Sequence, residues 1–184
     1  MAWIIVIVVV VLLLLYLVST YNKFVKMDNQ SEESLAQIDA HLKQRFDMIP
    51  NLVEIVKGYA KHEKETLEAV ITARNVGMNA KNLKEKDSAA KGLSESLKTV
   101  FALAESYPDL KANQGFIDLQ KQLTGVEEAL LQQRKYYNAV VKTFNTLIAT
   151  FPNSMVANMF SSKFSKKDYL EIESVARENV KIQF

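Results

Sequence analysis

The chain of 184 residues contains no cysteine, so disulfide bonds, thiolate zinc sites and cysteine nucleophiles are excluded. It has only five glycines and three prolines, and so few turn-forming residues argue against a many-stranded sheet and favour long helices. P-loops, GxGxxG fingerprints, HExxH zinc motifs and GxSxG nucleophile elbows do not occur. We therefore expect an all-α protein, and we predict no catalytic residues.

A strong net charge is also missing. The 23 Lys and Arg residues oppose 21 Asp and Glu residues, which gives a formal net charge of +2 at pH 7. A field this weak does not favour nucleic acid. His41 and His62 stand alone, without a second ligand four residues later, so they do not indicate a metal site. We predict no nucleic-acid partner, no metal and no cofactor.

A long apolar run opens the sequence, AWIIVIVVVVLLLLYLV from Ala2 to Val18. It carries no charge, and fourteen of its residues are Leu, Ile or Val. As a helix it would reach roughly 26 Å, close to the thickness of a hydrocarbon core. Trp3 and Tyr16 stand near its two ends, where amphipathic rings favour the headgroup layer. We expect residues 2–18 to lie in a lipid bilayer and residues 1–20 to form a single-pass anchor in the cell membrane.

Two other interpretations of this run fit less well. A cleaved signal peptide needs a basic start and small residues at the cut, whereas no Lys or Arg comes before the run and Val18-Ser19-Thr20 is a poor cleavage site. The second alternative, a helix buried in a soluble protein, fits poorly because the run is apolar on every side and the chain has only 184 residues.

The charges beside the run predict its orientation. Lys23 and Lys26 follow the run directly, so the positive-inside rule favours an outside N-terminus and a cytoplasmic body, although Asp28 partly offsets them.

The pattern after the anchor predicts that its helix continues into the body. No proline comes before Pro50 and no glycine before Gly58. Leu35, Ile38, Leu42 and Phe46 follow the spacing of one helix face. Ser31, followed by two glutamates, could instead cap a fresh helix. We predict continuity.

Three prolines share one context, with a bulky apolar residue before and a short polar residue after: Ile49-Pro50-Asn51, Tyr107-Pro108-Asp109 and Phe151-Pro152-Asn153. Each triplet predicts that one helix ends and another starts. Residues 79–87, NAKNLKEKD, are the predicted polar loop, with Asp87 or Ser88 as the cap of the next helix.

Apolar stripes at helical spacing cover residues 52–76, 93–104 and 116–148. The fold prediction is an N-terminal transmembrane helix that continues into an antiparallel bundle of about four long helices. We expect the bundle over residues 21–152. Residues 153–184 should form a short apolar segment and a tail, with a short helix and an extended end over residues 169–184.

Residues 45–53, RFDMIPNLV, followed by Lys57-Gly58-Tyr59, resemble the hallmark of the LemA family of bacterial membrane proteins. Further matches at the family's spacing follow along nearly the whole chain: Tyr21-Asn22, His62-Glu63, Ala104-Glu105, residues 107–113 (YPDLKAN), Arg134, Tyr137-Asn138, Asn145 and Phe151-Pro152. The resemblance implies an N-terminally anchored helical bundle. It carries over no activity and no catalytic residues, because the family has none that are agreed.

Several polar residues fall on the apolar stripes. At 100° per residue, Glu127, Arg134 and Asn145 lie within about 20° of Phe116. The full predicted polar core is Arg45, Glu63, Arg74, Glu127, Arg134, Asn138 and Asn145. These residues could form ion pairs that determine which helices meet, or Glu63 and Glu127 could serve as paired carboxylates of a membrane-bound enzyme. We favour ion pairs, and hence a non-catalytic scaffold or interaction module at the bacterial membrane.

The segment after Pro152 has an apolar face followed by lysines. Met155, Val156, Met159 and Phe160 share one side of a short helix, and Lys163, Lys166 and Lys167 come next. This arrangement suits a helix at the membrane surface, and the same residues could instead cap the bundle core. The expected partners are the lipid bilayer, through residues 2–18, and unidentified proteins. Homo-oligomerisation stays open.

Overall fold

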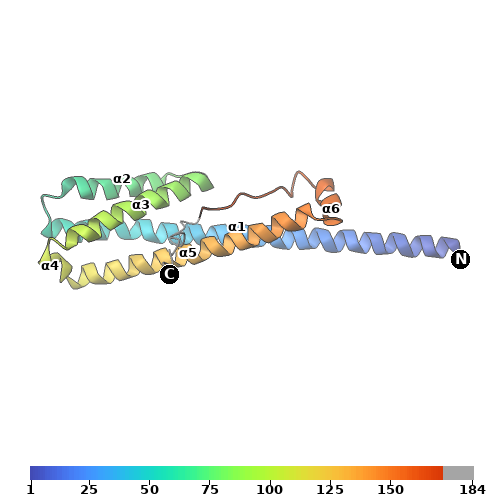
Figure 1. Cartoon of the computed structure of the whole chain (residues 1–184), viewed down its shortest axis with the longest axis horizontal. Coiled ribbons are helices and arrows are strands. Elements are labelled where there is room, and N and C mark those ends of the chain that lie inside the picture. Colours follow the sequence, from blue (N-terminus) through green and yellow to red (C-terminus); the bar gives the residue numbers. More distant parts are fainter. Residues whose placement is uncertain (172–184) are drawn as a thin grey trace, which may run out of the picture. The chain divides into compact units, whose positions relative to one another are not determined.

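The computed structural model describes residues 1–171, and within them it contains helices and no strand. The helices are α1 (Ala2–Tyr59), α2 (Lys64–Met78), α3 (Leu83–Ala104), α4 (Pro108–Lys111), α5 (Gln114–Ala149) and α6 (Asn153–Met159). Figure 1 shows them along the chain. The all-α prediction is confirmed. The helix and extended end expected within residues 169–184 lie largely outside the described residues.

The described residues form two compact units. Unit 1 comprises Met1–Ala40 and Lys135–Tyr169, and unit 2 comprises His41–Arg134 with Leu170 and Glu171. The first part of α1 and the last part of α5 therefore belong to unit 1, and the remainder of both helices belongs to unit 2.

α1 runs without a break through residues 28–31, as the sequence predicts. Ser31 does not cap a new helix, because its hydroxyl donates to the Asp28 carbonyl oxygen at 2.7 Å, inside the same helix. The Ser31 side chain is fully buried, as is that of Phe24 about two turns earlier. The anchor helix and the first helix of the body are thus one element.

The predicted helix end at Pro50 is wrong, because α1 continues through Pro50 to Tyr59. A proline lacks the N–H that would bind the carbonyl four residues earlier, so inside a helix it leaves that oxygen without its usual donor. Here the oxygen belongs to Phe46, and Arg74 Nε of α2 donates to it at 2.9 Å. A side chain from another helix therefore compensates for the proline.

α2 and α3 lie side by side in unit 2 (Figure 1). The loop between them is shorter than predicted, because α3 begins at Leu83 and its N-cap is Asn82 rather than Asp87 or Ser88. The Asn82 side chain accepts a hydrogen bond from the Glu85 N–H at 2.9 Å. α2 packs on α1 at Gly77, where a Cβ atom would overlap the Phe46 ring.

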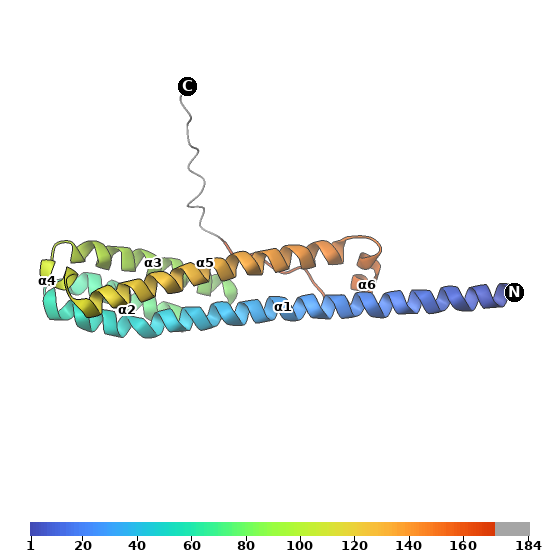
Figure 2. The ribbon, with the colours of Figure 1, turned by 90° about the horizontal axis from the view of Figure 1, so that it is seen from below.

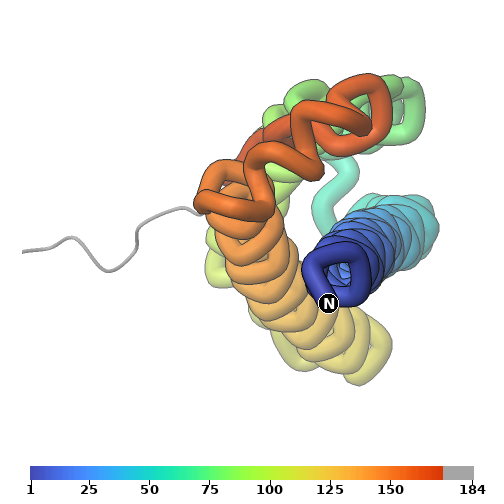
Figure 3. The backbone as a smooth tube through the Cα atoms, turned by 90° about the vertical axis from the view of Figure 1, so that its right-hand side faces the viewer, coloured from blue at the N-terminus to red at the C-terminus, as the bar shows by residue number. Residues whose placement is uncertain are grey.

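The two later prolines do mark helix starts, as predicted. Pro108 is the first residue of α4, and Pro152 comes directly before α6. In unit 1 an apolar cluster joins α1, α5, α6 and the segment that follows α6: Phe24, Phe144, Ile148, Val156, Ala157 and Phe164. Figure 2 shows the turn from α5 into α6 and the position of α6 beside α1. Figure 3 looks along α1 from its N-terminus and shows these three helical segments.

Candidate functional site

The first 18 residues or so of α1 form an apolar surface that is almost entirely exposed. An 18-residue window of this helix has a mean hydropathy of 3.1, and none of it is buried. By length and composition α1 can cross a membrane, and it is the one helix in the described part of the chain that meets these criteria. The N-terminal segment is therefore a membrane anchor.

Unit 2 contains an ion pair between α1 and α5. Arg45 Nη1 lies 2.5 Å from Glu127 Oε2; the Arg45 side chain is 4% exposed and the Glu127 side chain is 44% exposed. Arg45 Nη2 donates to the Ser94 hydroxyl oxygen at 3.1 Å, and that hydroxyl lies 3.3 Å from Glu127 Oε1. Burial lowers the pKa of Arg45, the Glu127 charge opposes this shift, and the Arg134 charge adds to it. The pair ties three helices together, because Ser94 belongs to α3.

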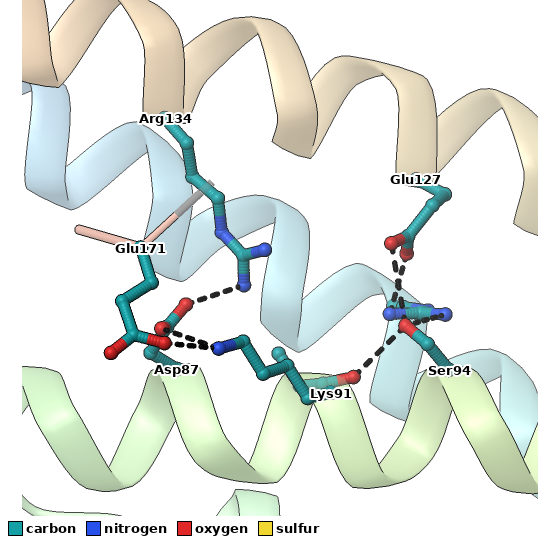
Figure 4. A network of polar contacts seen from close by, with 8 residues as sticks. Asp87, Lys91, Ser94, Glu127, Arg134 and Glu171 are labelled. Carbon is teal, nitrogen blue, oxygen red and sulfur yellow. Dashed lines mark hydrogen bonds and ion pairs between the residues drawn. The ribbon is translucent and has the colours of Figure 1, made fainter. Parts of the chain in front are cut away.

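A second ion pair joins α5 to α3. Arg134 Nη2 lies 3.0 Å from Asp87 Oδ1, and both side chains are 10% exposed. Lys91, one turn after Asp87, lies 3.9 Å from Asp87 Oδ2 and 2.5 Å from Glu171 Oε2. Figure 4 shows these groups pointing toward one another from α3, from α5 and from the segment at Glu171. The Arg134–Asp87 pair thus lies inside unit 2, and Lys91 extends the series of charges to Glu171, which is 79% exposed.

Asp87 is a member of this network that the sequence analysis missed. Asp87, Lys91 and Ser94 follow the i, i+4, i+7 spacing of one helix face. That spacing was the available signal, but the predicted loop over residues 79–87 removed Asp87 from the helix.

The other residues of the predicted polar core make separate contacts. Arg74 donates to the Phe46 carbonyl, as described above. Glu63, just before α2, accepts a hydrogen bond from the Tyr107 hydroxyl at 3.0 Å. This hydrogen bond raises the pKa of Tyr107, with smaller contributions from desolvation and from the Glu63 charge. The structure therefore brings together Arg45, Glu127 and Arg134 but gives Glu63 and Arg74 different partners.

Asn138 and Asn145 both belong to unit 1, and Asn145 binds the segment after α6. Its Nδ2 donates to the Lys167 carbonyl oxygen and its Oδ1 accepts from the Lys167 N–H, both at 2.9 Å. The Tyr137 hydroxyl donates to the Asp168 carbonyl oxygen at 3.1 Å. Burial raises the pKa of Tyr137, and the Asp168 charge adds to the shift. Two α5 side chains therefore hold an extended segment through its backbone, an arrangement that side-chain periodicity could not reveal.

The described residues contain two open grooves and no cluster of metal-ligating side chains. No group of three or more His, Asp or Glu residues in residues 1–171 could hold a metal ion. An open groove of about 400 Å³ lies between the end of α2 and the start of α3, lined by Ala73, Val76, Asn79, Ala80, Glu85, Ser88, Ala89 and Gly92. Another groove of about 470 Å³ is lined by Glu54, Lys57, Gly58 and Lys61. Neither groove includes Glu63 or Glu127.

The four residues predicted to contact the membrane surface divide into two pairs. Met155 and Met159 are 60% and 67% exposed, whereas Val156 is buried in the apolar cluster of unit 1. Phe160 is half-buried, and its ring centroid lies 4.9 Å from that of Tyr21. Phe151, which is 80% exposed, was not among the four.

These features define a class of protein, a helical bundle with one N-terminal membrane anchor and an ion-paired interior. The sequence model of the LemA family matches residues 34–184. The chain therefore belongs to the LemA family, and the resemblance noted from its motifs is confirmed.

Named relatives agree with this assignment. The chain is 25% identical over 144 residues to Protein LemA of Metamycoplasma hominis, a match that covers 76% of the chain and 64% of the relative. It is 21% identical over 181 residues to Magnetosome protein MamQ 2 of Paramagnetospirillum magneticum, covering 84% and 66%. The match to Magnetosome protein MamQ of Magnetospirillum gryphiswaldense is 21% identical and covers 74% and 60%. The chain thus spans slightly less than two thirds of the length of these relatives.

Proposed function

We propose that this LemA-family protein is a non-catalytic scaffold at the bacterial membrane. The observation that carries the proposal is the use of the ionisable groups inside unit 2. Arg45 engages Glu127 and Arg134 engages Asp87. Catalytic acids and bases need access to a substrate in a pocket, whereas these groups are engaged in joining α1, α3 and α5.

The ion pairs suit a scaffold because they fix how the helices meet. A buried charge that loses its partner is costly, so other helix registers are disfavoured. Unit 2 can then present a constant outer surface to other proteins while α1 holds it at the bilayer. Three relatives are named after a cellular structure, the magnetosome, which also supports a structural role.

We place the body of the protein in the cytoplasm. Lys23 and Lys26 follow the apolar run and are exposed, and lysines close to a membrane span favour the cytoplasmic side. The chain lacks cysteine, so a single Lys84→Cys variant can report the side on which α3 lies. An impermeant thiol reagent should label this variant only after intact cells are opened, and labelling before lysis would reverse the orientation.

The scaffold proposal is tested by capture of the full-length chain from membranes of its own cells after cross-linking. A chain with Glu63→Gln should recover the same proteins as the wild type, because Glu63 lies outside the Arg45–Glu127 and Arg134–Asp87 pairs and a scaffold acts through its surface. An anchor-only control, residues 1–33, should recover none of them. The proposal fails if the wild type recovers nothing beyond the control, or if Glu63→Gln abolishes a chemical turnover present in wild-type membranes.

A further inference from the structure

One hydrogen bond marks the position of α6 along the anchor. The Tyr16 hydroxyl donates to Asn153 Oδ1 at 2.7 Å. Tyr16 belongs to the apolar run, and Val18 at the end of the run lies only about 3 Å further along the helix axis. If residues 2–18 cross the hydrocarbon core, α6 must therefore begin at the boundary between acyl chains and headgroups.

α6 has one face in the protein and an apolar face outside it. Val156 and Ala157 are each 5% exposed and contribute to the cluster of unit 1. Met155 and Met159, one turn apart, are 60% and 67% exposed, and Phe151 in the preceding turn is 80% exposed. Large exposed apolar side chains that gather at one place indicate a surface that meets another apolar phase.

The charge around this surface has one sign. No Asp or Glu occurs in residues 1–27 or in residues 129–167. Lys163 Nζ lies 3.1 Å from the Tyr21 hydroxyl oxygen, which places this amine beside the turn of α1 that follows the apolar run. Lys23, Lys26 and Lys166 are also exposed, whereas Lys167 forms an ion pair with Asp28 at 2.7 Å. Lys163 at this level, with further exposed lysines nearby along the chain, suits the anionic headgroups of a bilayer.

We propose that α6 is an interfacial helix, with Phe151, Met155 and Met159 inserted among the lipids of the membrane that α1 enters. The proposal rests on the membrane tethering included in the proposed function. Lipid is the expected occupant because the exposed face lies at the level of the end of the apolar run and is accompanied by exposed lysines. An amphipathic helix with lysines nearby binds at this depth through apolar burial and electrostatic attraction. The protein then contacts the bilayer twice, once across it and once along its surface.

A depth-resolved fluorescence experiment on the full-length chain tests this placement. The chain has a single tryptophan, Trp3, so a Trp3→Phe background frees the signal for one new reporter. Met155→Trp and Met159→Trp provide two reporters on α6. The matched control is Tyr136→Trp on α5 of unit 1, because Tyr136 is 51% exposed and lies more than a dozen residues before α6.

Each variant is reconstituted in vesicles that contain anionic lipid and lipids brominated near the start of their acyl chains. Both α6 reporters should lose roughly half or more of their emission to these lipids and little to aqueous iodide. The Tyr136→Trp reporter should show the opposite response. Circular dichroism confirms that each variant keeps its helix content, and the second α6 reporter replaces the first if that one fails to fold.

The outcomes separate this inference from the proposed function. If alkaline carbonate extracts the wild-type protein from membranes, the anchor fails and the proposed function fails with it. If the protein resists extraction but both α6 reporters are quenched by iodide and not by brominated lipid, the interfacial helix alone is overturned. If neither iodide nor brominated lipid quenches the α6 reporters, protein covers the exposed apolar face of α6. This result also overturns the proposal that lipid covers it.

Discussion

Where α1 passes through unit 2, Arg45 lies against Glu127 of α5. Where α1 passes through unit 1, Phe24 shares an apolar cluster with Phe144 of the same α5 helix. Ion pairs are specific in position, because a displaced partner leaves a charge buried without compensation. Apolar contacts are non-directional and tolerate small displacements. Between α1 and α5 the two units thus differ in the kind of contact, an ion pair in unit 2 and an apolar cluster in unit 1.

The segments that complete each unit differ in the same way. In unit 1 the segment after α6 is held by Phe164, which is 3% exposed, by amide and hydroxyl bonds to its backbone, and by the ion pair of Lys167 with Asp28. In unit 2 Glu171 is held by the charge of Lys91, and this contact lowers the pKa of Glu171. An exposed ion pair of that kind contributes little to stability. The comparison therefore predicts which substitutions matter most in each unit.

The largest effect is expected at Arg134. Arg134→Ala should reduce the free energy of unfolding by roughly 3–5 kcal/mol, because the buried Asp87 would lose its close partner and keep only the longer contact with Lys91. Arg134→Lys should also lose stability, since an ammonium group cannot reproduce the guanidinium geometry. Urea unfolding of the full-length chain in detergent measures both. Hydrogen exchange should accelerate in α3 and leave residues 141–148 of unit 1 protected. A loss below about 0.5 kcal/mol for both variants would mean that the pair does not stabilise unit 2.

A smaller effect is expected at Arg74, and it should depend on Pro50. Arg74→Ala leaves the Phe46 carbonyl without a donor and should cost about 1–3 kcal/mol. In a Pro50→Ala background residue 50 supplies its own N–H to that carbonyl, so the same substitution should cost clearly less. A double-mutant cycle measured by urea unfolding gives the coupling. Equal costs in the two backgrounds would show that Arg74 does not compensate for the proline.

Unit 1 should respond locally to the loss of Asn145. Asn145→Ala removes both hydrogen bonds to the Lys167 backbone and should weaken the attachment of that segment by about 1–2 kcal/mol. Hydrogen exchange of residues 160–170 should accelerate, while α3 in unit 2 stays unchanged. Thr146→Ala, at an exposed neighbouring position of α5, is the matched control. If hydrogen exchange of residues 160–170 is equally slow in the two variants, the hydrogen bonds of Asn145 do not stabilise the attachment of this segment.

The smallest effect concerns the alkaline titration of Tyr107. Its pKa is raised by the hydrogen bond to Glu63, so the fold favours the neutral phenol. The corresponding stability is fully present below the unfolded pKa of about 10 and is lost as pH rises through the higher folded value. Glu63→Ala should lower the pKa of Tyr107, and Glu63→Gln should lower it less because an amide oxygen still accepts the hydrogen bond. Phenolate absorbance, corrected with Tyr107→Phe, measures the shift, and an unchanged titration in both variants would contradict the contact.

Much of the fold could be predicted from residue spacing. The continuity of α1 through Ser31 and the helix starts at Pro108 and Pro152 are local properties, and these predictions are confirmed. The interior position of Arg45 also followed from its place on an apolar stripe. The error at Pro50 has a non-local cause, since a donor from α2 replaces the hydrogen bond that proline removes.

Less of the candidate site could be predicted from the sequence. Asp87 was missed because its helix was predicted to start too late, and Phe151 because it comes before the helix that it accompanies. Val156 and Met155 are neighbours on one predicted apolar face, yet the first is buried and the second is exposed. Periodicity identifies a face of a helix, but it does not say where on that face the protein ends and the surroundings begin.

The sequence by itself determined the membrane anchor, the all-α class and the membership of the LemA family. Hydropathy, helical spacing and motif order are properties of residues close together along the chain, so they can be read without coordinates. Only the tertiary structure decided the partners of Arg134, Arg74 and Asn145, and only it set α6 beside Tyr16. Each of these contacts joins atoms from segments far apart in sequence, and the energy of such a contact depends on which buried group would otherwise stay unpaired.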